Sequence, residues 1–158
     1  MSPLPASHPA GVSLARPADL PRVQEIVEAA YGPWTPLLGQ RAGPMDDDYA
    51  AFIADGHALI YRPDGQEVLG LLVLIPQADA LMLDNVALAA EAKGKGHGRI
   101  LLDAAEQIAR AMGRDRIRLY THEKMAANIA IYAARGYVEA ARITEKGRNR
   151  VYMEKMLG

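Results

Sequence analysis

Apolar and polar residues alternate along this chain with two periods, which separate strands from helices. Short apolar or alternating runs predict seven strands, over residues 12–16, 57–61, 67–75, 80–88, 116–121, 137–143 and 150–156. Apolar positions at helical spacing, together with start and stop signals, predict helices over residues 20–30, 49–53, 99–112 and 125–135. The element order is then β-α-α-β-β-β-α-β-α-β-β, which favours an α/β or α+β protein with one mixed sheet between helices.

We expect a single domain over residues 11–158, preceded by a flexible N-terminal tail over residues 1–10. The 158 residues suit one domain, and no repeat or linker divides them. The first ten residues hold three prolines and no apolar run, which is unlike a secretory signal.

Several element ends carry specific predictions. Asp19 is a candidate N-cap for the helix that follows it, and one aspartate of 46–48 is expected to cap the next helix. The remaining aspartates either complement the helix dipole or attract a cationic amine. Pro76 is expected to end its strand, and Gly136 to close its helix in a left-handed conformation.

A glycine-rich stretch, residues 93–99 (Lys-Gly-Lys-Gly-His-Gly-Arg), joins a predicted strand to the longest predicted helix. Glycines let the backbone approach an anion closely, and a helix N-terminus attracts negative charge. The basic side chains add positive charge, so the stretch predicts a phosphate-binding loop; the alternative is a flexible surface loop. Neither the Walker pattern nor the dinucleotide fingerprint fits the glycine spacing.

The pattern Lys93-x-x-Gly96-x-Gly98, after the strand that ends at Leu88, resembles the coenzyme A motif of the GCN5-related N-acetyltransferases (GNAT family). The chain differs from the usual motif in having Lys93 where the family has Gln or Arg, and Ala89 where it often has Pro. The segment from Asn128 through Tyr132 to Gly136-Tyr137 is similar to a second family signature.

This resemblance implies a mixed, mostly antiparallel central sheet of about seven strands, flanked by helices and splayed between the fourth and fifth strands. It implies acetyl-CoA as the acyl donor, bound in the splay, and a primary amine as the acceptor. The implied cofactor-binding residues are Val86, Leu88, Lys93, Gly94, Lys95, Gly96, His97, Gly98, Arg99, Asn128 and Tyr132.

The same resemblance implies direct acetyl transfer, with Tyr132 as the general acid that protonates the leaving thiolate. Without the resemblance, Tyr132 is better explained as a helix residue packed on the sheet. Asp84 is the first candidate for the general base that deprotonates the amine, and Glu123 is the second. Asp84 has an alternative structural role, as a strand-end carboxylate bonded to the backbone. A backbone N–H near Leu88, at an expected strand bulge, is the candidate donor to the thioester oxygen.

The acceptor is a small-molecule or peptide amine, bounded by residues 31–49 and 144–150. Tyr31 and Trp34 are candidate walls of its pocket, although Trp34 could instead fill the edge of the core. Arg148 and Arg150 are interpreted as an exposed polar face, and gripping an acidic acceptor is the alternative.

The composition limits the partners. The net charge of −1 provides no basic footprint for nucleic acid, no apolar run is long enough to span a membrane, and the scattered histidines suggest no metal site. The absence of cysteine excludes disulfides and a cysteine nucleophile, and is compatible with a cytoplasmic location. We therefore expect a cytoplasmic enzyme without a metal, with homodimerisation through edge strands as an option. The alternatives are a non-catalytic coenzyme A-binding regulatory or partner module, and an enzyme that uses the glycine loop for another nucleotide.

Overall fold

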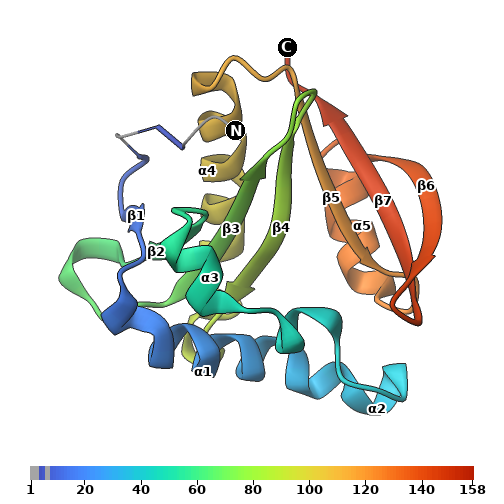
Figure 1. Cartoon of the computed structure of the whole chain (residues 1–158), viewed down its shortest axis with the longest axis horizontal. Coiled ribbons are helices and arrows are strands. Elements are labelled where there is room, and N and C mark those ends of the chain that lie inside the picture. Colours follow the sequence, from blue (N-terminus) through green and yellow to red (C-terminus); the bar gives the residue numbers. More distant parts are fainter. Residues whose placement is uncertain (1–3, 6–7) are drawn as a thin grey trace.

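Seven strands form one mixed sheet in the computed structural model, which describes residues 4–5 and 8–158 (Figure 1). The strands are β1 (Val12–Leu14), β2 (Ala58–Tyr61), β3 (Gly70–Pro76), β4 (Leu81–Leu88), β5 (Arg116–His122), β6 (Val138–Glu145) and β7 (Arg148–Met156). Their spatial order is β1-β2-β3-β4-β5-β7-β6, and only the β4–β5 pair is parallel. The predicted mixed, mostly antiparallel sheet is thus confirmed.

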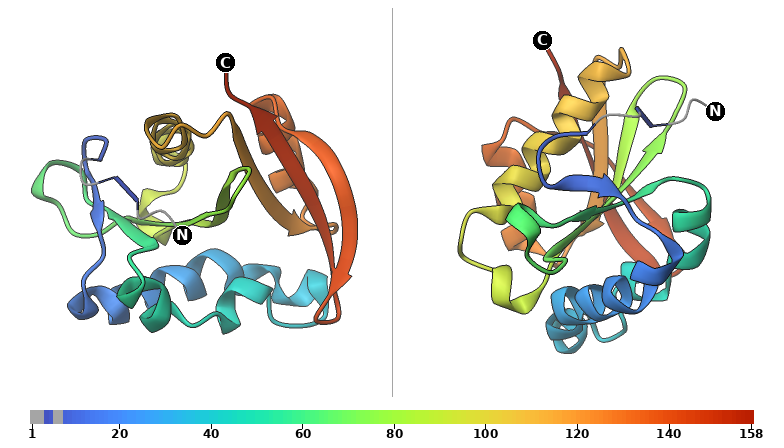
Figure 2. Two further views of the ribbon diagram at one scale, coloured as in Figure 1. Left: turned by 45° about the horizontal axis from the view of Figure 1, so that its top comes forward. Right: turned by 90° about the vertical axis from the view of Figure 1, so that its left-hand side faces the viewer.

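Helices cover both faces of this sheet. They are α1 (Leu20–Tyr31), α2 (Thr35–Leu38), α3 (Tyr49–Ala54), α4 (His97–Ala111) and α5 (Ala126–Ala134). The first three helices lie on one face and α4 and α5 on the other (Figure 2). Short 3-10 turns connect several of these elements, as at Gly43–Asp46 before α3 and Ala90–Ala92 after β4.

Strand β3 shows why the sheet is buried on both sides. Successive side chains of a strand point to opposite faces. Leu72 and Leu74 therefore pack in the cluster that includes Leu101 of α4, while Leu71 and Val73 pack in the cluster that includes Ile26 of α1. Because both faces are covered, this strand is a nearly continuous apolar run.

The sheet opens between β4 and β5. These strands pair only from Leu81↔Ile117 to Leu83↔Leu119, and they diverge beyond that point (Figure 1). The register between β3 and β4 shifts at Val73/Leu74, so Asp84 has no partner on β3 and forms a bulge. The bulge expected beside Leu88 therefore lies at Asp84 instead, because Leu88 remains in register with β3.

Some predicted element ends are wrong by a few residues. Strand β3 begins at Gly70 rather than at residue 67, and it includes Pro76, which still faces Leu81 beside the turn to β4. Helix α4 begins at His97, inside the glycine stretch, so that Gly98 belongs to its first turn.

The capping predictions have mixed outcomes. The Asp19 side chain does not cap α1; its Oδ2 accepts the backbone N–H of Arg16 at 2.8 Å across a 3-10 turn. Asp48 does cap α3, since its Oδ1 accepts the N–H of Ala51 at 3.1 Å. Gly136 follows α5 with a φ of +97°, as predicted.

The expected N-terminal tail can be followed only in part. Its residues 1–3, 6 and 7 lie outside the described residues, while Leu4 packs against the core cluster beneath α4. Among the helices of the described residues, none combines the length and apolar character needed to cross a membrane.

Candidate functional site

Two cavities meet where β4 and β5 separate. The large cleft has a volume of about 780 Å³, and the small pocket has a volume of about 50 Å³. Both cavities are lined by Tyr31, Val86, Asn128 and Tyr132. Two molecules, one in each cavity, would therefore meet at these four residues.

Different elements supply the remaining walls. The large cleft is also lined by Ala30, Trp34, Ala87, Leu88, Lys93, Gly96, Gly98, Arg99, Leu102, Ile131, Ala134 and Arg135. The small pocket is also lined by Leu38, Ala42, Gly43, Pro44, Leu83, Asp84, Asn85, Leu119, Tyr120, Thr121, His122, Met125, Arg148 and Arg150.

The glycine stretch forms one end of the large cleft. Gly94 and Gly96 have φ angles of +77° and +84°, which other residues adopt only with strain. Helix α4 starts there without a side-chain cap, so its first N–H groups remain available to an anion. Lys93 and Arg99 line the cleft and form no ion pair with any described residue. This end of the cleft is suited to phosphate.

Three of the predicted cofactor-binding residues lie elsewhere in the stretch. Gly94, Lys95 and His97 do not line the large cleft. The Nδ1 atom of His97 instead lies 2.9 Å from the hydroxyl of Tyr61 on β2. The imidazole therefore ties the start of α4 to the sheet, and a contact of this residue with a ligand would have to come from its backbone.

The edge of β4 that faces the opening has backbone groups that do not pair with β5. The N–H of Ala89 donates to Leu69 on the β3 side, at 2.8 Å. Because successive N–H groups of a strand point to opposite edges, those of Val86 and Leu88 point toward the opening. The same edge no longer pairs with β5, so a bound molecule can take the place of the missing strand.

Tyr132 stands at the junction of the two cavities. Its ring contacts Tyr137 edge-on, with centroids 5.9 Å apart, and its hydroxyl has no hydrogen-bond partner among the described residues. Burial raises the pKa of Tyr132 to about 12, so the side chain stays protonated over the working pH range. Tyr132 is therefore available as a protonated hydrogen-bond donor at neutral pH.

A buried hydrogen-bond chain holds the floor of the small pocket. The hydroxyl of Tyr31 donates to Oδ1 of Asn85, whose Nδ2 donates to the hydroxyl of Tyr49 at 2.8 Å. The Tyr49 hydroxyl donates to the carbonyl oxygen of Pro44. The chain thus connects α1, β4 and α3. The sequence analysis did not predict this role for Asn85. A polar residue inside an apolar strand was the feature that could have indicated a buried hydrogen bond.

Asp84, at the bulge, is the carboxylate of the small pocket. Burial, and then the negative charge of Asp47, raise the pKa of Asp84 to about 6. The hydroxyl of Tyr120 on β5 lies 3.4 Å from its Oδ1 and acts in the opposite direction on the pKa. A carboxylate whose pKa lies near neutrality suits a general base. Tyr120 was not predicted as a site residue, because only the meeting of β4 and β5 brings it to Asp84.

Glu123, the second candidate base, lies outside both cavities. Its Oε1 accepts a hydrogen bond from Nδ2 of Asn149 at 2.9 Å, and its Oε2 lies 3.9 Å from the guanidinium of Arg142. It thus ties the end of β5 to β6 and β7. Among the described residues, no group of three or more His, Asp and Glu side chains could hold a metal ion.

Arg148 and Arg150 were interpreted as an exposed face, and that interpretation is wrong. Their side chains are 17% and 14% exposed and line the small pocket. The Arg150 guanidinium lies over the ring of Tyr120, 4.2 Å from its centroid. Trp34 packs against the cluster around Leu38, as the core-edge alternative predicted. It lines the large cleft and not the small pocket, whereas Tyr31 lines both.

The chain resembles known acetyltransferases in sequence. Residues 20–137 match the family described as "Acetyltransferase (GNAT) family". Mouse N-alpha-acetyltransferase 80 is 30% identical over 102 residues, which are 65% of this chain. The chain spans only 28% of the length of that relative.

Solved structures share the fold. The PaiA N-acetyltransferase of Thermoplasma acidophilum, in complex with coenzyme A, superimposes with a TM-score of 0.73 at 20% identity, over 92% of this chain and 97% of that one. The ribosomal-protein-S18-alanine N-acetyltransferase of Escherichia coli superimposes with a TM-score of 0.71 at 18% identity, over 93% of each chain. At these identities, the similarity supports the fold alone.

Proposed function

The chain belongs to the GNAT family of acetyltransferases, and on that premise we propose that it transfers the acetyl group of acetyl-CoA directly to a primary amine. One observation supports the proposal most directly. The large cleft, which is suited to phosphate, and the small pocket, which contains the carboxylate of Asp84, meet at Tyr132. The large cleft would hold acetyl-CoA, and the small pocket would hold the acceptor.

The residues of the large cleft fit acetyl-CoA. The N-terminus of α4, with Lys93 and Arg99, supplies donors and positive charge for the pyrophosphate. The backbone N–H groups of Val86 and Leu88 and the carbonyl oxygen of Leu88 supply partners for the pantetheine amides, and the Leu88 N–H is a candidate donor to the thioester oxygen. The carbonyl oxygen of Val86 already lies 3.3 Å from the hydroxyl of Tyr31.

The transfer needs three proton movements. Asp84 accepts a proton from the ammonium group and passes it to solvent, and the neutral nitrogen attacks the thioester carbon. The C–N bond forms, and the nitrogen loses its second proton to Asp84. The C–S bond breaks, and the electron pair stays on sulfur. The Tyr132 hydroxyl donates its hydrogen bond, and finally its proton, to that sulfur; solvent then restores the tyrosine.

Binding of the donor tests the first part of this proposal. We expect acetyl-CoA to raise the melting temperature, because a ligand that binds only the folded protein stabilises it. Lys93→Ala and Arg99→Ala should each weaken acetyl-CoA binding roughly tenfold, since each removes a charge that faces the pyrophosphate. Arg110→Ala, at the opposite end of α4, is the matched control and should bind normally. Calorimetry measures all four proteins.

Release of free thiol tests the second part. Incubation with acetyl-CoA and a panel of primary amines should release coenzyme A faster than incubation without amine. Lack of any stabilisation by millimolar acetyl-CoA would reject the proposal. Binding of acetyl-CoA without thiol release for any amine would favour the non-catalytic module instead.

A further inference from the structure

The side chains that line the small pocket include more guanidinium groups than carboxylates. Its lining includes two arginines, Arg148 and Arg150, but only one carboxylate, Asp84. The two guanidinium groups converge on the same wall. A Cβ atom placed on Gly43 would lie 3.5 Å both from Nε of Arg148 and from Nη2 of Arg150. A simple alkylammonium ion would meet two like charges there, which disfavours it as the acceptor.

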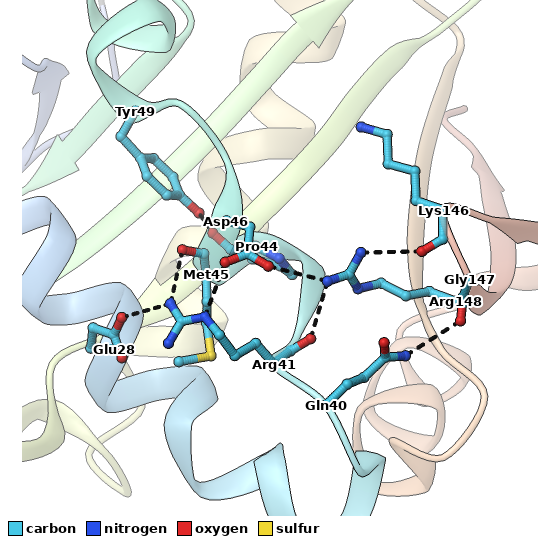
Figure 3. Close-up of polar contacts among 10 residues, drawn as sticks. All are labelled: Glu28, Gln40, Arg41, Pro44, Met45, Asp46, Tyr49, Lys146, Gly147 and Arg148. Carbon is cyan, nitrogen blue, oxygen red and sulfur yellow. Dashed lines mark hydrogen bonds and ion pairs between the residues drawn. The ribbon is translucent and has the colours of Figure 1, made fainter.

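The hydrogen bonds of Arg148 leave its Nε–H and one N–H of its Nη1 unused. Its Nη2 donates to Oδ2 of Asp46 at 3.2 Å and to the carbonyl oxygen of Arg41 at 3.3 Å, and its Nη1 donates to the carbonyl oxygen of Lys146 (Figure 3). Its Nε is buried and has no partner among the described residues. Protein atoms cover this Nε, so Arg148 acts on a ligand in the pocket through its charge rather than through a direct hydrogen bond from Nε.

The charge of Arg150 is also incompletely paired. Its nearest carboxylate oxygen, Oε1 of Glu145, lies 3.7 Å from Nη1, beyond hydrogen-bond distance, and that glutamate also accepts the hydroxyl of Tyr152. The guanidinium of Arg150 stacks on the ring of Tyr120, while the hydroxyl of the same tyrosine faces Asp84. A single tyrosine therefore separates the negative and positive ends of the pocket.

Resting on the proposed function, we propose that the acceptor is a small amino acid-like molecule, which carries a carboxylate close to its primary amine. The amine would face Asp84, and the carboxylate would face Arg150, with the charge of Arg148 beside it. Guanidinium groups bind carboxylates strongly because several N–H groups point the same way.

Contacts between the walls favour a small acceptor. The turn between β6 and β7 reaches the segment before α3, where Arg148 binds Asp46 and Nε2 of Gln40 donates to the carbonyl oxygen of Gly147 at 3.4 Å (Figure 3). This bridge spans one side of the small pocket, since Arg148 also lines it. A free amino acid therefore enters the pocket more easily than an amine within a protein chain, which would have to pass this bridge.

The test compares the common L-amino acids with their carboxamides, which keep the amine and the shape but lose the negative charge. With acetyl-CoA present, thiol release should show at least one free acid with a kcat/KM roughly 100-fold above that of its amide. The amine of the carboxamide is less basic than the amine of the free acid, so it loses its proton more easily. Basicity alone would therefore make the carboxamide the faster substrate, which is the opposite of the expected result. Short peptides with free N-termini are tested as a third class of acceptor.

Arg150→Met should remove the preference by slowing the acid roughly 100-fold while leaving the amide rate within about threefold. Arg150→Lys should restore part of it. Melting temperature with and without acetyl-CoA shows that each variant folds and binds the donor. Arg142→Met, on β6 and outside both cavities, is the matched control and should keep the preference.

The outcomes separate this inference from the proposed function. Equal rates for acids and amides, or faster acetylation of peptides, would overturn the inference and leave the acetyltransferase proposal intact. If no amine releases thiol, the proposed function fails. Binding then decides the inference: with coenzyme A present, acids should raise the melting temperature more than amides in the wild type but not in Arg150→Met, and equal shifts would overturn it.

Discussion

Replacement of Tyr132 by Phe is expected to lower kcat by at least about 100-fold while changing the affinity for acetyl-CoA by less than about threefold. The ring lines both cavities and would remain in place, so binding surfaces are preserved. The hydroxyl has no partner among the described residues, and the developing thiolate would be its partner in the reaction. The expected loss is therefore confined to the chemical step. Single-turnover thiol release measures it.

Tyr137→Phe is the matched control for this experiment. The Tyr137 hydroxyl is buried and has no hydrogen-bond partner within the described part of the chain. The Tyr137 ring packs against the ring of Tyr132 and lines neither cavity. Removal of the hydroxyl should leave turnover unchanged and should not destabilise the fold. If Tyr132→Phe keeps wild-type turnover, the general-acid role is wrong, and Tyr132 only packs against the sheet.

Asp84→Asn is expected to lower kcat/KM by about 100-fold and to abolish its dependence on pH near 6. In the wild type, activity should fall tenfold per pH unit below about 6, because protonated Asp84 cannot accept a proton. Asp47→Asn is the control. Because the charge of Asp47 raises the pKa of Asp84, removing that charge should shift the fall in activity to lower pH without eliminating it. An unchanged profile in Asp84→Asn would exclude Asp84 as the base.

The same substitution should make the protein more stable at neutral pH. The folded pKa of Asp84 is raised, to about 6, so the folded protein binds more protons than the unfolded chain between about pH 4 and pH 6. Stability therefore falls as pH rises through this window and stays lower above it. Asparagine carries no charge, so Asp84→Asn should gain on the order of 1–3 kcal/mol at pH 8 and little at pH 4. Urea unfolding at the two pH values measures this difference.

Most of the fold could be predicted because it follows from local patterns. The alternating residues of β3 and the helical spacing in α4 each bury a defined face, so the element order was evident. The element ends were harder, because residues such as Pro76 and His97 are placed by contacts with β4 and with Tyr61. Those contacts come from distant parts of the chain.

The candidate site was predictable only where one segment carries the signal. The glycine stretch combines its glycines, its charges and the start of a helix, so its position at a cleft was foreseen. The charge state of Asp84 depends on the bulge and on Asp47, which no single segment contains. Arg148 was misinterpreted for the same reason, since the segment that it packs against, with Arg41, Gly43 and Asp46, lies far from it in the sequence.

The incomplete pairing of β4 with β5 has a further consequence, for the empty protein. An unpaired strand edge is a template on which another extended chain can add. Between Asp84 and Leu88 this edge lies inside the sheet rather than at its rim. A bound donor would occupy the edge and shield it from foreign strands. Keeping the protein saturated with its ligand would then guard it against aggregation as well as preparing it for catalysis.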